Sequence, residues 1–415
     1  MNTPLAADGA RPALRPLDDA LAELLGHAQP LAATEILSTF EADGRVLAQD
    51  LVSALQVPPH DNSSMDGYAV RGSEIAAAGV VLPVSQRIAA GTAPEPLAAG
   101  SVARIFTGAP IPAGADAVVM QEDTEPAGEG MVRILRAPKP GHWIRRSGED
   151  VQRGAVVLAR GERLTPAALG MAAGIGMDKL MVARRPRVAL FSTGDELVMP
   201  GEVPPGKMRP GAIYNSNRFF LRALLHRLGC EVTDLGIVPD RRDATVDALR
   251  RASSGHDLIL TSGGVSVGEE DHVKPAVQAL GSLDLWQIAI KPGKPFAYGK
   301  VGPAHFIGLP GNPVSSFVTF LLLVRPFVLK LQGATRLAPA AVPLPAHFSV
   351  QRPDKRREFL RVRRNPAGGL DLFANQSSGV LTSAVWSDGL VDNPPGHTIA
   401  WGESVPVMLL AELIA

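Results

Sequence analysis

The spacing of apolar residues divides the chain into segments with different expected structures. Between residues 16 and 28, leucine and alanine recur at intervals of three and four, which predicts an amphipathic helix. From about 51 to 150, short valine- and isoleucine-rich runs alternate with proline and glycine, as is typical of a turn-rich β module. Helical spacing returns near residue 164, where Thr165 can cap a helix and Pro166 can begin it. We therefore expect the β module (51–150) to be inserted into a helical linker domain formed by residues 1–50 and 151–185.

Strand and helix patterns alternate over residues 186–333. Apolar strands are expected at 187–193, 230–238, 257–262, 285–290, 295–299 and 305–309, with helices after several of them and a long helix after Asn312. Such alternation predicts a doubly wound α/β domain, in which helices cover both faces of a mostly parallel sheet. Residues 334–415 have the pattern of a small C-terminal β domain.

Composition narrows the class of protein. The chain has 415 residues with 46% hydrophobic content, and its 41 basic and 41 acidic residues cancel. No overall field therefore attracts nucleic acid or a membrane, and any anion site must be built locally. The single cysteine, Cys230, cannot form an internal disulfide and is expected to be a buried packing residue. The N-terminus lacks a signal-peptide pattern, and Arg325 and Pro326 interrupt the most apolar stretch, so we expect a cytoplasmic protein.

Polar residues follow several of the predicted strands. In open α/β sheets, ligands bind beyond the carboxyl ends of the strands. These ends carry "STGDE" with Glu196, "VPD" with Asp240, "TSGGVSVGEED" from residue 261, and "LPGNP" from residue 309. Any one of them would be an ordinary turn, but together they predict a cleft for a polar ligand.

The glycine-rich stretch suits an anion. Gly263, Gly264 and Gly268 can turn backbone N–H groups inward, and the start of a helix near residue 272 would add partial positive charge. The spacing matches neither the Walker motif nor the dinucleotide motif. The acidic run that ends at Asp271 would repel an anion unless a divalent cation lies between them, and Mg²⁺ is typically held in this way. The alternative is a solvated helix start, which acidic residues also favour.

Further charged turns could contribute to the same site. Lys291 and Lys294 flank a Pro-Gly turn that suits an oxyanion, although a solvated surface turn would have the same pattern. In the β module, Asp66, Thr107 and Asp150 lie in loops whose mixed charge exceeds what turn formation requires.

Seven motifs occur in an order that resembles the molybdopterin molybdenumtransferase family, to which the C-terminal part of gephyrin is related. They include "DNSSMDGYAV", "FTGAPIPAGADAVVMQED", "RRSGEDV", "SGGVSVGEEDH", "IKPGKPFAYG" and "GLPGNPVSS". The resemblance implies a linker domain with an inserted β module, an α/β molybdopterin-binding domain and a C-terminal β-barrel-like domain. It also implies a homodimer whose subunits share each active site, and partners that include the molybdopterin adenylyltransferase and recipient molybdoenzymes.

The reaction implied by the resemblance consumes adenylylated molybdopterin, releases AMP and inserts molybdate into the dithiolene, with Mg²⁺ or another divalent cation. The implied catalytic positions are Asp66, Thr107, Asp150, Glu196, Asp240, Asp271 and Lys291. Metal ligands would be Glu196, Asp240 and Asp271, with Asp66 from the second subunit. The expected substrate-binding positions are Ser262, Gly263, Gly264, Ser266, Gly268, Lys294, Pro310, Gly311, Asn312, Arg361 and Ser378.

One position departs from the family pattern. Gln287 stands where the family commonly has a lysine, which removes one positive charge from the expected oxyanion subsite. Either Lys294 or a basic residue of the C-terminal domain compensates, or the position is dispensable.

Three other functions would use some of these features. An adenylyltransferase would make the adenylate and consume ATP, and it has no need of the flanking β modules. A scaffold of the gephyrin type usually adds long disordered segments, which this sequence lacks. A sugar- or nucleotide-phosphate binding protein would leave the β-module motifs unexplained.

Overall fold

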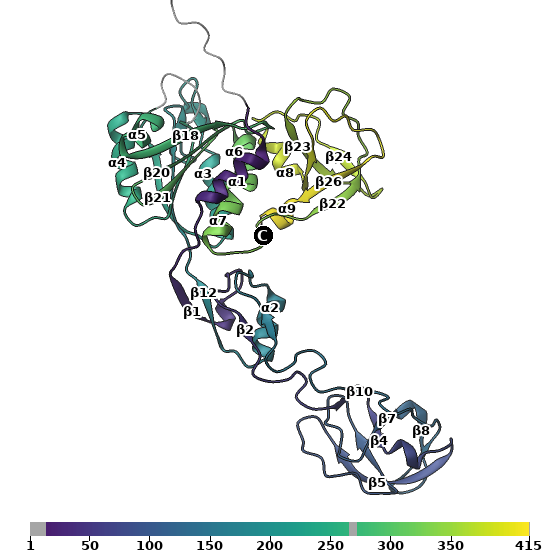
Figure 1. The fold of residues 1–415 in the computed structure, drawn as a ribbon. Coiled ribbons are helices and arrows are strands. Elements are labelled where there is room, and N and C mark those ends of the chain that lie inside the picture. The colour runs from purple at the N-terminus through teal and green to yellow at the C-terminus, as the bar shows by residue number, and fades with distance from the viewer. Residues whose placement is uncertain (1–13, 265–271, 415) are drawn as a thin grey trace, which may run out of the picture.

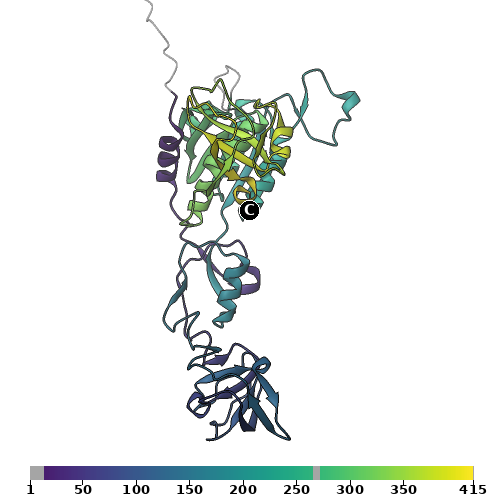
Figure 2. The ribbon, with the colours of Figure 1, turned by 90° about the vertical axis from the view of Figure 1, so that its right-hand side faces the viewer.

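The computed structural model describes residues 14–264 and 272–414. The molecule is elongated (Figures 1 and 2), with the α/β and C-terminal domains at one end, the linker domain in the middle and the β module at the other end. The chain passes through the linker domain before it enters the β module and again after it leaves the module (Figure 1).

The α/β domain is built on a six-stranded sheet in the order β16-β13-β17-β21-β20-β18. Its strands are β13 (Arg187–Thr193), β16 (Glu231–Val238), β17 (Leu258–Ser262), β18 (Gly281–Gln287), β20 (Pro295–Val301) and β21 (Ala304–Leu309). The first four in the sheet are parallel, whereas β20 and β18 are antiparallel to their neighbours. The continuous apolar runs of β13 and β17 are buried because helices cover both faces of the sheet.

Two groups of helices cover the two faces of the sheet. One face carries α4 (Arg242–Ser253) and α5 (Val273–Leu280), and the other carries α3 (Asn217–Arg227), α6 (Pro313–Thr319) and α7 (Arg325–Leu331). Cys230 packs in the second core, and burial raises its pKa to about 12, which confirms the expected packing role. The predicted α/β domain is therefore present, with a mixed sheet whose two faces are covered by helices.

The long helix predicted after Asn312 is continuous from Pro313 to Leu331, with a π-helical turn, η5 (Phe320–Val324), between α6 and α7. It has 19 residues and is apolar enough to cross a membrane by length and composition, but 83% of its most apolar window is buried inside the protein. It is therefore the core helix of the α/β domain.

The N-terminal helix α1 (Leu17–His27) is placed differently from our expectation. We assigned it to the linker domain, but its buried residues Leu17 and Leu24 pack in the core that contains α7. An amphipathic pattern shows that one helix face is covered, not which domain covers it.

The linker domain contains more strand than expected. It consists of the pairs β1 (Thr34–Ser38) with β12 (Lys179–Ala183) and β2 (Leu51–Val52) with β11 (Val156–Leu158), together with η1 (Thr39–Glu41) and α2 (Pro166–Gly174). Helix α2 begins as predicted, because the Thr165 hydroxyl accepts a hydrogen bond from Ala168 N at 3.2 Å and Pro166 is in the first turn.

The β module has a six-stranded sheet in the order β7-β4-β6-β5-β9-β8. Its elements are β3 (Asn62–Ser63), β4 (Gly67–Val70), η2 (Gly72–Glu74), β5 (Val80–Ile88), β6 (Val102–Ile105), β7 (Ala117–Met120), η3 (Gln121–Asp123), β8 (Thr124–Pro126), β9 (Met131–Ile134) and β10 (Ile144–Arg145). The two chain passes that connect the module meet where Val57 N donates to Val151 O at 2.8 Å.

The C-terminal domain is joined to the α/β domain by a shared sheet, in the order β19-β23-β25-β26-β22 with β24 beside β23. Strand β19 (Ile290–Lys291) comes from the α/β domain. The others are β22 (Ala341–Pro345), β23 (Arg357–Arg364), β24 (Leu370–Leu372), β25 (Gly389–Asn393) and β26 (Ser404–Leu409), with helices α8 (Leu381–Trp386) and α9 (Leu410–Leu413). The strand path is open in the described residues, so barrel closure stays a prediction.

Candidate functional site

The carboxyl ends of the parallel strands form one edge of the α/β sheet, which we call the ligand edge. Strand order changes direction between β13 and β17, and this is where doubly wound folds bind ligands. Buried side-chain atoms without a hydrogen-bond partner in the described structure gather here: Ser192 Oγ, Thr193 Oγ1, Asn215 Nδ2, Asp240 Oδ1 and Thr261 Oγ1. Because unpaired buried polar atoms are rare, this concentration indicates a site for a polar ligand.

The glycine loop after β17 lies very close to the end of β13. A Cβ on Gly263 would be 2.7 Å from Thr193 O, and one on Gly264 would be 2.4 Å from Val273 Cγ2. Both residues also have positive φ, +95° and +66°. Only glycine fits here, so the backbone of the loop is exposed at the ligand edge without side chains in the way.

The same loop is bonded to the turn after β21. Gly263 N donates to Leu309 O at 3.1 Å, and Asn217 Nδ2 donates to both Ser262 Oγ and Gly311 O at 2.7 Å. The structure therefore brings Ser262, Gly263 and Gly264 together with the Pro310–Asn312 turn, as expected. Asn217, at the start of α3, was missed, although a buried asparagine at a helix start beside a strand end is a signal that could have identified it.

The structure describes only some of the acids predicted at the ligand edge. Asp240 follows β16 and has a buried, unpaired oxygen, whereas Glu196 is exposed and its carboxylate folds back over Gly194. Asp271, Ser266 and Gly268 lie outside the described residues. Within residues 14–264 and 272–414, no group of three or more His, Cys, Asp or Glu side chains is arranged to hold a metal ion. The four-carboxylate metal site thus stays a prediction.

The lysine turn lies at the same edge, because β18 ends and β20 begins there. Lys291 Nζ is 3.0 Å from Glu358 Oε1 and 3.5 Å from Asp354 Oδ2, so two carboxylates of the C-terminal domain neutralise it. Lys294 has no ion pair in the described part of the chain and is half-buried. Gln287, the last residue of β18, pairs in register with Pro295.

The C-terminal domain contributes Ser378 and Arg361. Asn312 Nδ2 donates to Ser378 Oγ at 3.2 Å, which joins these two predicted residues. Arg361 is 1% exposed, and it donates from Nε to Ser383 Oγ and from Nη1 to Phe359 O, while Nη2 has no partner among described residues. Burial lowers the pKa of Arg361 to about 10. In this conformation the guanidinium supports the interface with α8 and is closed to solvent.

In the β module, Asp66 and Thr107 form a second cluster. Thr107 donates to Asp66 Oδ1 from its backbone N–H at 2.8 Å and from its hydroxyl at 2.7 Å. These two bonds, with a smaller contribution from Arg104, lower the pKa of Asp66. Asp150 is exposed in the loop that leaves the module, where its N–H donates to Val57 O. Within one chain, this cluster is at the opposite end of the molecule from the ligand edge (Figure 1).

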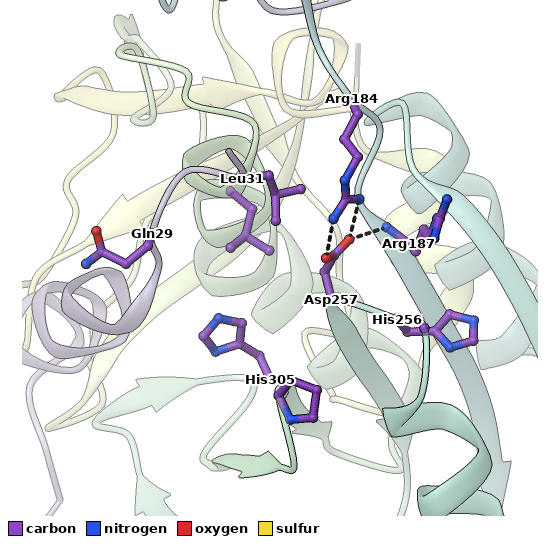
Figure 3. Close-up of a pocket in the computed structure, with 10 residues that line it drawn as sticks. Gln29, Leu31, Arg184, Arg187, His256, Asp257 and His305 are labelled. Carbon is purple, nitrogen blue, oxygen red and sulfur yellow. Dashed lines mark hydrogen bonds and ion pairs between the residues drawn. The ribbon is translucent and has the colours of Figure 1, made fainter. Parts of the chain in front are cut away.

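A cavity of about 310 Å³ lies at the other edge of the sheet (Figure 3). Arg184 donates to both oxygens of Asp257, at 2.7 and 2.8 Å, and Arg187 N adds a third bond. Although burial opposes it, these bonds lower the pKa of Asp257, and burial lowers the pKa of His305 to about 4. The Asp257 carboxylate accepts three hydrogen bonds, and both linker connections pass this point. We therefore interpret the ion pair as structural, because it holds the linker connection of Arg184 against the α/β domain.

Known domain families match the chain in order. Residues 15–176 match the MoeA N-terminal region (domain I and II), residues 189–330 match a probable molybdopterin binding domain, and residues 343–410 match the MoeA C-terminal region (domain IV). The three matches follow the linker domain with its β module, the α/β domain and the C-terminal domain seen in the structure.

Relatives of similar length agree with these matches. The molybdopterin molybdenumtransferase of Haemophilus influenzae is 44% identical over 333 residues, 80% of each chain. That of Nostoc sp. is 37% identical over 392 residues, which cover 91% of this chain and 89% of the relative. The crystal structure of the molybdopterin biosynthesis moeA protein from Pyrococcus horikoshii is 30% identical with a TM-score of 0.82, over 96% of this chain and all of that one. The chain therefore belongs to the MoeA family of molybdopterin molybdenumtransferases.

Proposed function

We propose that the protein hydrolyses adenylylated molybdopterin, releases AMP and transfers molybdate to the dithiolene sulfurs. The observation that carries this proposal is the ligand edge, where unpaired buried polar atoms surround a glycine loop that leaves its backbone open. A pterin with a pyrophosphate offers the many polar atoms that such an edge can bind. The family relationship supplies the identity of the ligand.

The backbone of the α/β domain would position the substrate. The Gly264 N–H and the turn from Pro310 to Asn312 would bind the pterin and its phosphates, and Asn217 fixes both loops relative to each other. Because these contacts lie on rigid strand ends, the two reactants are held in place before reaction.

We propose that the acids hold a divalent cation, Mg²⁺. Asp240 has a buried oxygen without a partner, which is the donor such an ion requires. Glu196, Asp240 and Asp271 would bind it, and Asp66 of a second subunit would complete the set. The ion would neutralise charge that develops on the phosphoryl oxygens.

We propose a homodimer in which each site uses the β module of the second subunit. In one chain, the β module that carries Asp66, Thr107 and Asp150 lies at the opposite end of the elongated molecule from the α/β domain (Figure 1). The linker domain also exposes large apolar side chains that a second copy could cover, namely Ile36 (64% exposed), Val52 (50%), Val156 (54%) and Phe40 (98%).

Molybdate, a dianion, would bind near the lysine turn. Lys291 is already paired with Glu358 and Asp354, whereas Lys294 has no ion pair among the described residues, so its charge is the one we assign to the oxyanion. This arrangement supports Lys294 as the replacement for the charge lost at Gln287. A cytoplasmic location, and handover from the adenylyltransferase and to recipient molybdoenzymes, complete the proposal.

Subunit complementation tests both the chemistry and the shared site. Asp66→Asn and Asp240→Asn variants are each expected to lose AMP release from purified adenylylated molybdopterin. When the two variants are co-expressed and form dimers at random, about a quarter of wild-type activity should be recovered. Half of the dimers are then mixed, and each mixed dimer has one intact site. Asp195→Asn, at an exposed neighbour of Glu196, is the matched control and should stay fully active.

Two results would contradict the proposal. Full activity of both single variants would reject the carboxylate assignment, and lack of recovery in mixed dimers would reject the shared site. ATP consumption with metal-free molybdopterin would instead support an adenylyltransferase.

A further inference from the structure

Two arginines lie side by side on one face of the β-module sheet. Arg87 on β5 and Arg104 on β6 are register partners, and Tyr68 on β4 is the partner of Arg104 on its other side. The Arg87 and Arg104 Cζ atoms are 4.5 and 4.8 Å from the centroid of the Phe106 ring, and Arg104 Cζ is 5.2 Å from that of Tyr68. We call these four residues the arginine platform.

The arginine platform carries a net positive charge. Neither arginine forms an ion pair with a carboxylate in the described part of the protein. Arg104 instead donates to two neutral acceptors, Gly67 O at 3.2 Å and Gln121 Oε1 at 2.8 Å. Stacking on aromatic rings orients the guanidinium groups but leaves their charges in place. Two adjacent cations repel each other, and an anionic ligand would relieve that repulsion.

The platform continues to the predicted Asp66–Thr107 pair. Asp66 is two residues before Tyr68, and Thr107 directly follows Phe106. Two arginines stand against the one carboxylate of Asp66, so the surface keeps a net positive charge and a ligand anion that approaches this pair meets the platform.

We propose that the arginine platform binds the phosphate of the nucleotide part of the substrate, so that Arg87 and Arg104 determine specificity for a phosphorylated nucleotide. This inference rests on the proposed function, in which the β module reaches the site of the second subunit. A guanidinium group can donate two hydrogen bonds at once to phosphate oxygens, and two adjacent guanidinium groups therefore suit a phosphate. Nucleic acid is a poorer fit, because the chain has no net charge and the platform has two arginines and no extended basic stripe.

The experiment compares Arg87→Gln, Arg104→Gln and the double variant with Arg133→Gln. Arg133 is an exposed arginine of β9 in the same sheet, opposite Glu125, and serves as the matched control. We expect the KM for adenylylated molybdopterin to rise about tenfold or more for each platform variant, with kcat nearly unchanged. Calorimetry with AMP as the probe should show a parallel loss of affinity, and Arg104→Lys should retain part of it.

Circular dichroism and thermal unfolding establish that each variant is folded. An unchanged KM and an unchanged AMP affinity in the folded double variant would overturn the inference, as would equal losses in Arg133→Gln. If the wild-type protein fails to release AMP but binds it in a platform-dependent way, the proposed function fails while the platform stands.

Discussion

Alanine at Gly263 should damage the ligand edge more than alanine at Gly255. The two glycines flank the same strand, β17, and both have positive φ, +95° and +109°. A Cβ at Gly263 would be 2.7 Å from the backbone oxygen of Thr193, whereas one at Gly255 would have no atom within 4 Å. Comparing the two alanine variants therefore separates the effect of the close contact from the effect of the backbone conformation.

The expected magnitudes follow from these two terms. A left-handed conformation costs an ordinary residue roughly 1–2 kcal/mol, so Gly255→Ala should lower the free energy of unfolding by about that amount. Overpacking adds roughly 1–3 kcal/mol to Gly263→Ala, because Thr193 O belongs to the central strand β13 and cannot move aside alone. Gly263→Ala should therefore lose about 2–5 kcal/mol in total.

Hydrogen exchange of the amides in β17 measures this loss locally, which matters because a multidomain chain does not unfold in two states. AMP release should fall in Gly263→Ala and remain near wild type in Gly255→Ala. Equal losses of protection in both variants would refute the steric part of the reasoning, and full activity of Gly263→Ala would separate the glycine loop from the substrate.

Three other changes have clear expected outcomes. Since the pKa of Asp257 is lowered, its pairing with Arg184 stabilises the fold above about pH 4, and this stabilisation is lost as the pH falls further. Asp257→Asn should lower the free energy of unfolding by about 2–3 kcal/mol at neutral pH. Thermal unfolding of this variant should also depend less on acid pH. Trp143 has a φ of +56°, so Trp143→Asn should stabilise the β module by about 1 kcal/mol in urea unfolding. Thr107→Val removes one of two hydrogen bonds to Asp66, so NMR titration should show a higher pKa for Asp66 that is still below its ordinary value.

Local patterns predicted much of the fold because each element has its own sequence cause. The buried runs of β13 and β17 were identifiable from unbroken apolar residues, and α2 from the Thr165–Pro166 start. The ligand edge was predictable for the same reason, since polar residues follow strands whose ends must meet in a parallel sheet.

Contacts between segments that are distant in the sequence could not be predicted from local patterns. The bonds from Asn217 to Ser262 and Gly311 depend on how α3 packs against two loops. The burial of Arg361 depends on α8, which the sequence pattern did not place. Stacking of Arg87 on Phe106 requires the register between β5 and β6, and nothing in a single strand specifies that register.

The meeting of Val57 and Val151 has a practical consequence for engineering. Because the chain enters and leaves the β module at one point, the module could be excised and the cut closed with a short turn, leaving the sheet pairs of the linker untouched. The released piece would have neighbouring termini, as independently folding inserts do. Grafting the β module of a relative between these two points should therefore exchange the module without disturbing the rest of the chain.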